Sequence, residues 1–305
     1  MNATVCAGIE VWSMRTRLCE FTLGLAVIAS AVGLDLFCAL GQPAPGESAP
    51  RSKFTLACRL ANYQGCEQAA WTHLPAIGVR HVFMSVPAAD QVEIVRKRLA
   101  DHGLKAVVFR GDADLARPEG VDQLDGQLAV CERMGVKYLF LSAKSRDVPK
   151  ALVYQRLRRA GDLAARHGVT IAIETHPDLG TNGDVLLETM RQVDHPCVRV
   201  NFDTGNIHFY NDGMDAPTEL RKILPFVATV EIKDHDGGVG EWRFPALGRG
   251  RVNIAAVLQI LTEHGYSGPI TMEIEGVKDV SRTPQQIQED IAQSAAYLRT
   301  LAAFE

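Results

Sequence analysis

The stretch HGVTIAIE, residues 167–174, contains the pattern that decides the fold. Gly168 follows a helical segment, and a glycine just past the last turn accepts the left-handed conformation that ends a helix. The next residues are apolar up to Glu174, as expected of a buried strand that ends in a polar residue. The same helix-ending signal recurs at Gly103, Gly135 and Gly265. The sequence therefore predicts a repeated alternation of helix and strand.

From Lys53 onward, short apolar runs alternate with longer segments of helical period, which is typical of βα units around a parallel sheet. The expected strands are 55–58, 82–86, 106–110, 138–141, 170–174, 198–203, 227–233 and 270–275. The expected helices include 90–102, 123–134, 150–167, 183–193, 217–224, 254–264 and 283–301. Eight strands favour one closed (β/α)8 barrel. An open doubly wound sheet shares the helix-ending signal, but no GxGxxG turn follows the first strand.

Composition indicates an ordinary globular protein. The chain has 305 residues, 47% of them hydrophobic and 22% charged, with a formal net charge of -4. This balance, without a run of Lys or Arg, excludes a general affinity for nucleic acid. The seven cysteines lack the paired short spacing of a zinc knot or a redox motif. Cys58 and Cys66 are close enough to pair in an exported protein, although buried free thiols are the commoner case.

The N-terminal segment resembles an export signal. Residues 14–17 (MRTR) supply a positively charged start, and Met14 is an alternative start of translation. Residues 21–34 are apolar or small. Residues 39–41 (ALG) offer small residues for cleavage, and the apolar run is too short for a stable membrane span. We therefore expect a signal peptide at 1–41, a flexible spacer at 42–52 and a barrel domain at 53–305. The protein would then be exported, either periplasmic or secreted. If the N-terminal segment is not a signal, the protein would be cytoplasmic.

The second half of the chain places an acid at the end of four successive expected strands. In a β/α barrel the C-terminal strand ends converge on one mouth. A carboxylate there is costly to bury unless it is paired, protonated or bound to a metal, so four together predict a shared cation. The four acids are Glu174, Asp203, Glu231 and Glu273.

At these residues the chain resembles a known family, the xylose isomerase-like TIM barrels. The family includes sugar phosphate isomerases and epimerases, inosose dehydratases, ketose 3-epimerases and endonuclease IV. The matching segments lie in family order at 173–176 (IETH), 201–206 (NFDTGN), 230–234 (VEIKD), 246–250 (ALGRG) and 270–276 (ITMEIEG). The resemblance spans residues 53–302, and its specific motifs lie between 171 and 276.

The resemblance implies that Glu174, Asp203 and Glu273 bind a divalent metal and that the two glutamates also move protons. Where many members carry His, this chain has Glu231. An all-oxygen ligand set favours Mg²⁺ or Mn²⁺, with Lys233 offsetting the excess negative charge and able to hold a substrate oxygen. Alternatively Glu231 lies outside the ligand set and His235 or a water takes its place.

Other polar and aromatic residues are candidates for substrate contacts. His176 shares a strand face with Glu174, and Arg249 is placed to reach a hydroxyl or carboxylate. Trp242 and Phe244 suit an apolar wall against which a sugar ring packs. Alternatively, they only anchor their loop to the barrel. Asn206 is a candidate for supporting the metal ligands, whereas His208 is expected to be structural. Glu275 is the alternative to Glu273 as the metal ligand from the eighth strand.

This set of residues suits proton abstraction next to a carbonyl, in a metal-dependent isomerase or epimerase acting on a free sugar or polyol. Loss of a β-hydroxyl would instead make the enzyme a dehydratase of the keto-inositol type. A barrel that only binds carbohydrate is a further alternative. A phosphodiesterase resembling endonuclease IV fits least, because it needs many histidines and a basic groove, and this chain has nine His. The sequence does not predict the oligomeric state.

Overall fold

The computed structural model describes residues 54–305. The expected signal peptide and spacer lie outside the described residues. Within the described part, no helix combines the length and the apolar character needed to cross a membrane.

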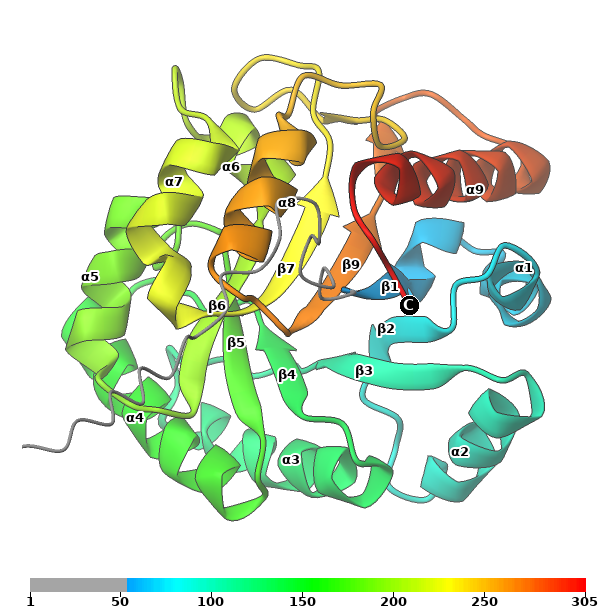
Figure 1. Cartoon of the computed structure of the whole chain (residues 1–305). Helices are drawn as coiled ribbons and strands as arrows, with labels where there is room; N and C mark the ends of the chain where they lie inside the picture. Colours follow the sequence, from blue (N-terminus) through cyan, green and yellow to red (C-terminus); the bar gives the residue numbers. More distant parts are fainter. Residues whose placement is uncertain (1–53) are drawn as a thin grey trace, which may run out of the picture. The chain divides into compact units, whose positions relative to one another are not determined.

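Eight parallel strands close into a barrel, with helices outside it (Figure 1). The strands follow one another in chain order around the barrel, and the last pairs with the first through the register Thr55↔Pro269 to Cys58↔Met272. They are β1 (Thr55–Arg59), β2 (His81–Ser85), β3 (Lys105–Arg110), β4 (Tyr138–Leu141), β5 (Thr170–Glu174), β6 (Val198–Asp203), β7 (Val227–Lys233) and β9 (Pro269–Glu273). The predicted (β/α)8 barrel is confirmed.

The first eight α-helices lie between strands along the chain, and the ninth follows the last strand. They are α1 (Ala70–Ala76), α2 (Val92–Asp101), α3 (Asp122–Met134), α4 (Lys150–Arg166), α5 (Gly183–Val193), α6 (Thr204–Tyr210), α7 (Ala216–Ile223), α8 (Ile254–Glu263) and α9 (Pro284–Leu301). The pattern did not predict the short α1 and α6. The glycines expected to end helices adopt positive φ, for example 69° at Gly135 and 62° at Gly168.

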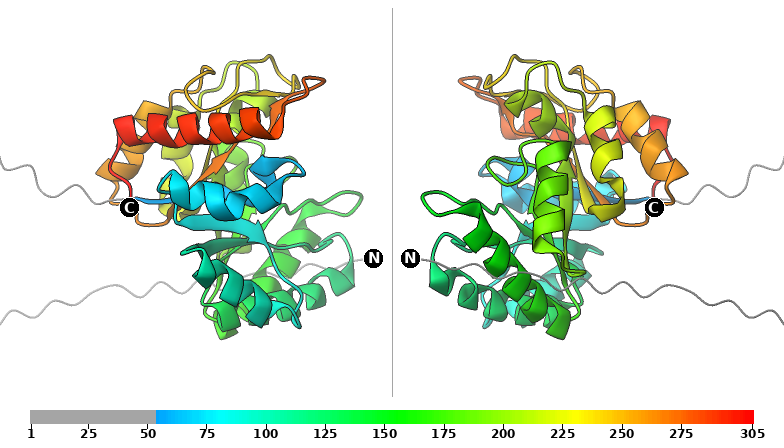
Figure 2. Two further views of the ribbon diagram at one scale, coloured as in Figure 1. Left: turned by 90° about the vertical axis from the view of Figure 1, so that its right-hand side faces the viewer. Right: turned by 90° about the vertical axis from the view of Figure 1, so that its left-hand side faces the viewer.

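The eighth barrel strand is shorter than expected because the chain leaves the barrel after Glu273. Residues Gly276–Val277 (β10) instead pair antiparallel with Arg243–Phe244 (β8) in the loop that follows β7. This two-stranded sheet joins the loops after β7 and β9, which gather at one end of the barrel in both side views (Figure 2). The site is formed at that end.

The apolar core has two parts. A large cluster of buried side chains fills the space between strands and helices, and a small one of Phe83, Val108 and Phe140 fills the barrel interior. The described cysteines are free thiols, so Cys58 and Cys66 are not paired. Burial raises the pKa of the Cys58 thiol to about 12, consistent with an inert core residue.

Candidate active site

One polar side chain from nearly every barrel strand points into the barrel at its C-terminal end. Side chains two apart share a strand face, so these residues continue the inward rows that include Phe83, Val108 and Phe140. They are Arg59, Ser85, Arg110, Glu174, Asp203, Glu231 and Glu273, with Ser142 directly after β4. A cavity of about 580 Å³ opens among them. Arg59, Ser85, Arg110, Ser142, Glu174 and Glu273 line it directly, whereas Asp203 and Glu231 are fully buried.

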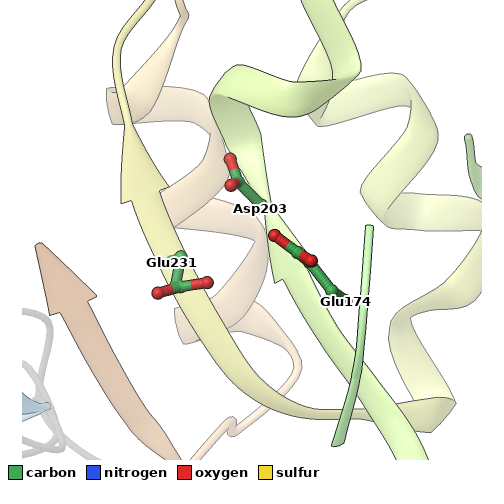
Figure 3. A group of neighbouring side chains, drawn as sticks. All are labelled: Glu174, Asp203 and Glu231. Carbon is green, nitrogen blue, oxygen red and sulfur yellow. The ribbon is translucent and has the colours of Figure 1, made fainter. Parts of the chain in front are cut away.

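Three of the four predicted acids meet on neighbouring strands. Glu174, Asp203 and Glu231 come from β5, β6 and β7, and each offers an oxygen within 4.8 Å of the other two (Figure 3). Glu174 is partly exposed to the cavity, and the other two are buried. This group is the best candidate in the described chain for a shared cation.

Asp203 is held by the start of α6. Its Oδ1 accepts hydrogen bonds from the backbone N–H groups of Gly205 (2.9 Å) and Asn206 (3.0 Å), which caps the helix. Its Oδ2 is buried without a hydrogen-bond partner, 3.6 Å from the Nζ of Lys233. Burial raises the pKa of Asp203 to about 7, against the opposing effect of Lys233. An oxygen left open in this way is available to a cation.

Glu231 has one satisfied oxygen and one open oxygen. Asn201 donates to its Oε2 at 2.8 Å, while its Oε1 has no hydrogen-bond partner and lies 3.3 Å from the Nη1 of Arg59. Burial raises the pKa of Glu231 and Arg59 opposes it, while the nearby charge of Glu174 adds to the increase. A divalent cation bound by this group would offset the cost of burying the charges of Asp203 and Glu231.

Glu273 lies apart from these three and has two cationic partners. Its Oε1 pairs with Arg59, and its Oε2 is 3.5 Å from the Nζ of Lys233. Lys233 also pairs with Glu275, which lines the cavity beside Glu273. Burial alone would lower the pKa of Lys233, but the carboxylates of Asp203 and Glu275 raise it above its usual value. Lys233 therefore lies between the acids as their shared counter-charge.

Aromatic side chains form one wall of the cavity. The rings of Trp242 and Phe244 are 5.2 Å apart, and the Nζ of Lys233 is 4.2 Å from the Phe244 ring centroid. Phe244 is buried, whereas Trp242 remains 41% exposed. His176 also lines the cavity, its ring edge-on to Tyr210 at 5.0 Å.

Arg249 does not line the cavity. Its guanidinium extends to α9, where Nη1 pairs with Asp290 at 3.0 Å, and its side chain is 54% exposed. Arg249 is thus the predicted site residue that the structure places away from the cavity, and Glu273 lines the cavity but lies outside the group of Glu174, Asp203 and Glu231. Asn206 also lines the cavity, donating to the carbonyl of Thr175 and accepting from Lys233.

Arg59 is a site residue that the sequence did not reveal. It stacks over Phe83 (4.7 Å to the centroid) and Phe140 (5.3 Å) inside the barrel, and it contacts Glu231 and Glu273. The expected first strand ended at Cys58, so Arg59 was not treated as a strand end. The alternation Thr55, Ala57, Arg59 was the available signal.

Asp234 is the anchor of the loop after β7. Its two oxygens accept from the backbone N–H groups of His235 (2.9 Å), Gly248 (2.9 Å), Gly250 (2.8 Å) and Val252 (3.1 Å). These hydrogen bonds connect Asp234, directly after β7, to the ALGRG segment at residues 246–250. The anchored loop carries β8 and its aromatic residues to the cavity.

We expect Asp234→Ala to lower the free energy of unfolding by about 3 kcal/mol, because four backbone donors, those of the buried His235 and Val252 among them, lose their acceptor. Chemical denaturation measures this change. The exposed Asp236, which pairs with Arg243, provides the matched control, and Asp236→Ala should cost less than about 1 kcal/mol. Equal effects of the two changes would contradict the anchoring role.

Comparisons with known proteins find relatives at low sequence identity. L-ribulose-5-phosphate 3-epimerase UlaE from Salmonella typhi is 22% identical over 203 residues, which is 64% of this chain and 69% of that protein. Another curated relative matches over only 58% of its own length. The activities of whole relatives therefore carry over only as proposals.

Solved structures share the fold at low identity. D-psicose 3-epimerase from Clostridium cellulolyticum H10 superposes with a TM-score of 0.66 at 14% identity, covering 82% of this chain and 99% of that one. A xylose isomerase-like barrel from Mycobacterium smegmatis, solved with magnesium, gives 0.64 at 18% identity, covering 81% and 96%. The model of the family described as xylose isomerase-like TIM barrel matches residues 56–301. The chain belongs to the xylose isomerase-like TIM barrel family.

Proposed function

We propose that this protein is a divalent-metal-dependent sugar isomerase or epimerase that removes a proton from a carbon next to a carbonyl. The carrying observation is the group Glu174, Asp203 and Glu231, whose oxygens approach within 4.8 Å at the end of the cavity-forming strands. Two buried oxygens of this group, on Asp203 and Glu231, have no hydrogen-bond partner. The donor set is entirely oxygen, which suits Mg²⁺ or Mn²⁺.

The chain's own residues divide the work. Glu174 and Glu273 both line the cavity, and β6 and β7 separate their strands, so they reach a bound sugar from different directions. One takes the proton and the other returns it. When bound, the cation supplies Lewis-acid polarisation of the carbonyl oxygen.

The remaining side chains orient the substrate and position Glu273. Lys233 and Arg59 hold Glu273 between them, so this carboxylate has a fixed position in the cavity. Trp242 presents an apolar surface on which the C–H face of a sugar can rest. His176 follows the end of β5 by two residues, lines the same cavity as Glu174 and is placed to bond a hydroxyl.

The test is solvent-deuterium exchange into a panel of ketoses, aldoses and keto-inositols, followed by NMR with added Mg²⁺ or Mn²⁺. Incorporation at one carbon identifies the substrate and the position of proton removal. Product analysis then separates epimerisation, isomerisation and dehydration. Metal-loaded protein that exchanges nothing across the panel would overturn the proposal in favour of a binding function.

Metal removal should weaken the fold measurably. After chelation and dialysis, adding Mg²⁺ or Mn²⁺ at about 100 times its Kd should raise the free energy of unfolding by about 2.7 kcal/mol, because the cation binds only the folded site. Chemical denaturation with and without the ion measures this difference. In Asp203→Asn the increase should be lost. An increase of the same size in this variant would place the cation elsewhere.

A further inference from the structure

The cavity side formed by β2, β3 and β4 carries donors and no acids. Ser85 and Arg110 end β2 and β3, and Ser142 and Lys144 follow β4. The carboxylates among the described lining residues belong to β5 and to β9 and its following loop. The cavity is therefore asymmetric, because its lining carboxylates all lie outside the side formed by β2, β3 and β4.

The backbone beneath these donors is fixed. Ser85 and Arg110 are paired in the barrel register, as are Arg110 and Phe140. The residue after Lys144 is held by Asp178, whose carboxylate accepts from both the backbone N–H (2.8 Å) and the hydroxyl of Ser145. The two cationic side chains thus start from defined positions at the edge of the cavity.

Arg110 and Lys144 differ from the other two cations that line the cavity. Arg59 and Lys233 each pair with carboxylates. Neither Arg110 nor Lys144 has a carboxylate within 4.0 Å among residues 54–305. Their charge is therefore available to a ligand, with the hydroxyls of Ser85 and Ser142 beside them.

We propose that this side of the cavity binds an oxyanion of the substrate, which makes the substrate an acidic sugar. The chemical class is a polyhydroxylated aldehyde or ketone with a carboxylate or a phosphate away from the reacting carbon. Charge-assisted bonds from a guanidinium and an ammonium recognise either group. This inference rests on the proposed function for the reacting end of the molecule, which faces the acids.

Calorimetric titration of the full-length, Mg²⁺-loaded protein tests the inference at fixed ionic strength. Each series compares a hexose, its uronate and its 6-phosphate, in the gluco, galacto and manno configurations. In one series a charged member should bind at least about tenfold more tightly than the neutral sugar. Whether the uronate or the phosphate does so identifies the anion.

Arg110→Gln and Lys144→Gln should each weaken the charged ligand by about tenfold and weaken the neutral sugar by a clearly smaller factor. Arg166→Gln removes the same charge from α4, where the side chain is exposed, and should change neither ligand. Absence of any preference for the charged members overturns the proposal, whether or not the neutral sugars bind. A preference for the charged ligand that survives when Arg110 and Lys144 are both replaced by Gln also overturns it.

Deuterium exchange on the same samples separates this inference from the proposed function. A charged-ligand preference that depends on Arg110 and Lys144, without exchange into any sugar, keeps the oxyanion subsite and removes the isomerase or epimerase. Exchange into a neutral sugar at a rate unaffected by either variant keeps the isomerase or epimerase and removes the oxyanion subsite.

Discussion

Glu174→Gln is expected to lower the rate of deuterium incorporation by about 10³-fold, because a side chain positioned for proton transfer contributes roughly 10² to 10⁴. Glutamine keeps the size and polarity of the side chain but cannot accept the proton. Glu174 lies where β5 meets the cavity, with one oxygen near those of Asp203 and Glu231. Single-turnover exchange followed by NMR measures the effect.

The matched control is Glu188→Gln on the exposed face of α5, where, within residues 54–305, the carboxylate accepts only from Gln192. Its exchange rate should equal that of the unmodified protein. Metal content measured on both variants separates loss of the proton acceptor from loss of the cation. Glu174→Gln that retains metal and more than about a tenth of the rate would assign the proton transfer to another residue.

Much of the barrel was predictable because its signals are local. Each expected strand is found within one or two residues, since apolar runs bounded by glycine and polar residues are a property of the chain itself. The short α1 and α6 were missed because seven residues give too little periodicity to recognise. β8 and β10 were missed because their two-residue pairing joins loops that are distant in sequence.

The candidate site was predictable where several strand ends repeat one chemistry. The acids of β5, β6 and β7 converge as expected from parallel strands. The separate position of Glu273 was not predictable, because it depends on Arg59, which barrel closure between β1 and β9 brings beside it. The sequence around Arg249 likewise contains no sign of an ion-pair partner. Its partner Asp290 comes from α9, which is distant in sequence and packs beside the loop.

Arg110 shows a different limit. It ends an expected strand on the inward face, as the acids do, but one cation at a strand end has many explanations. Its meaning depends on Ser85, Ser142 and Lys144 at the same side of the cavity. Such a grouping comes from three strands in space and is not visible in any one segment.

Glu231→His should change which metal the protein prefers. An imidazole in place of one carboxylate adds a softer nitrogen donor and removes a negative charge, so the Zn²⁺ to Mg²⁺ affinity ratio should rise by about 10- to 100-fold. The reason is the position of Glu231 Oε1, which is buried, open, and grouped with Glu174 and Asp203. Competition titrations of metal-free protein with a chromogenic chelator measure both affinities.

Two further variants separate the possible causes. Glu231→Gln removes the charge without adding a nitrogen, so it should weaken both metals and leave their ratio nearly unchanged. Glu263→His makes the same replacement on the exposed face of α8 and should alter neither affinity. If Glu231→His binds both ions as the unmodified protein does, Glu231 is no ligand. Its buried charge would then serve only to balance Arg59, 3.3 Å away, and the cation would depend on Glu174 and Asp203 alone.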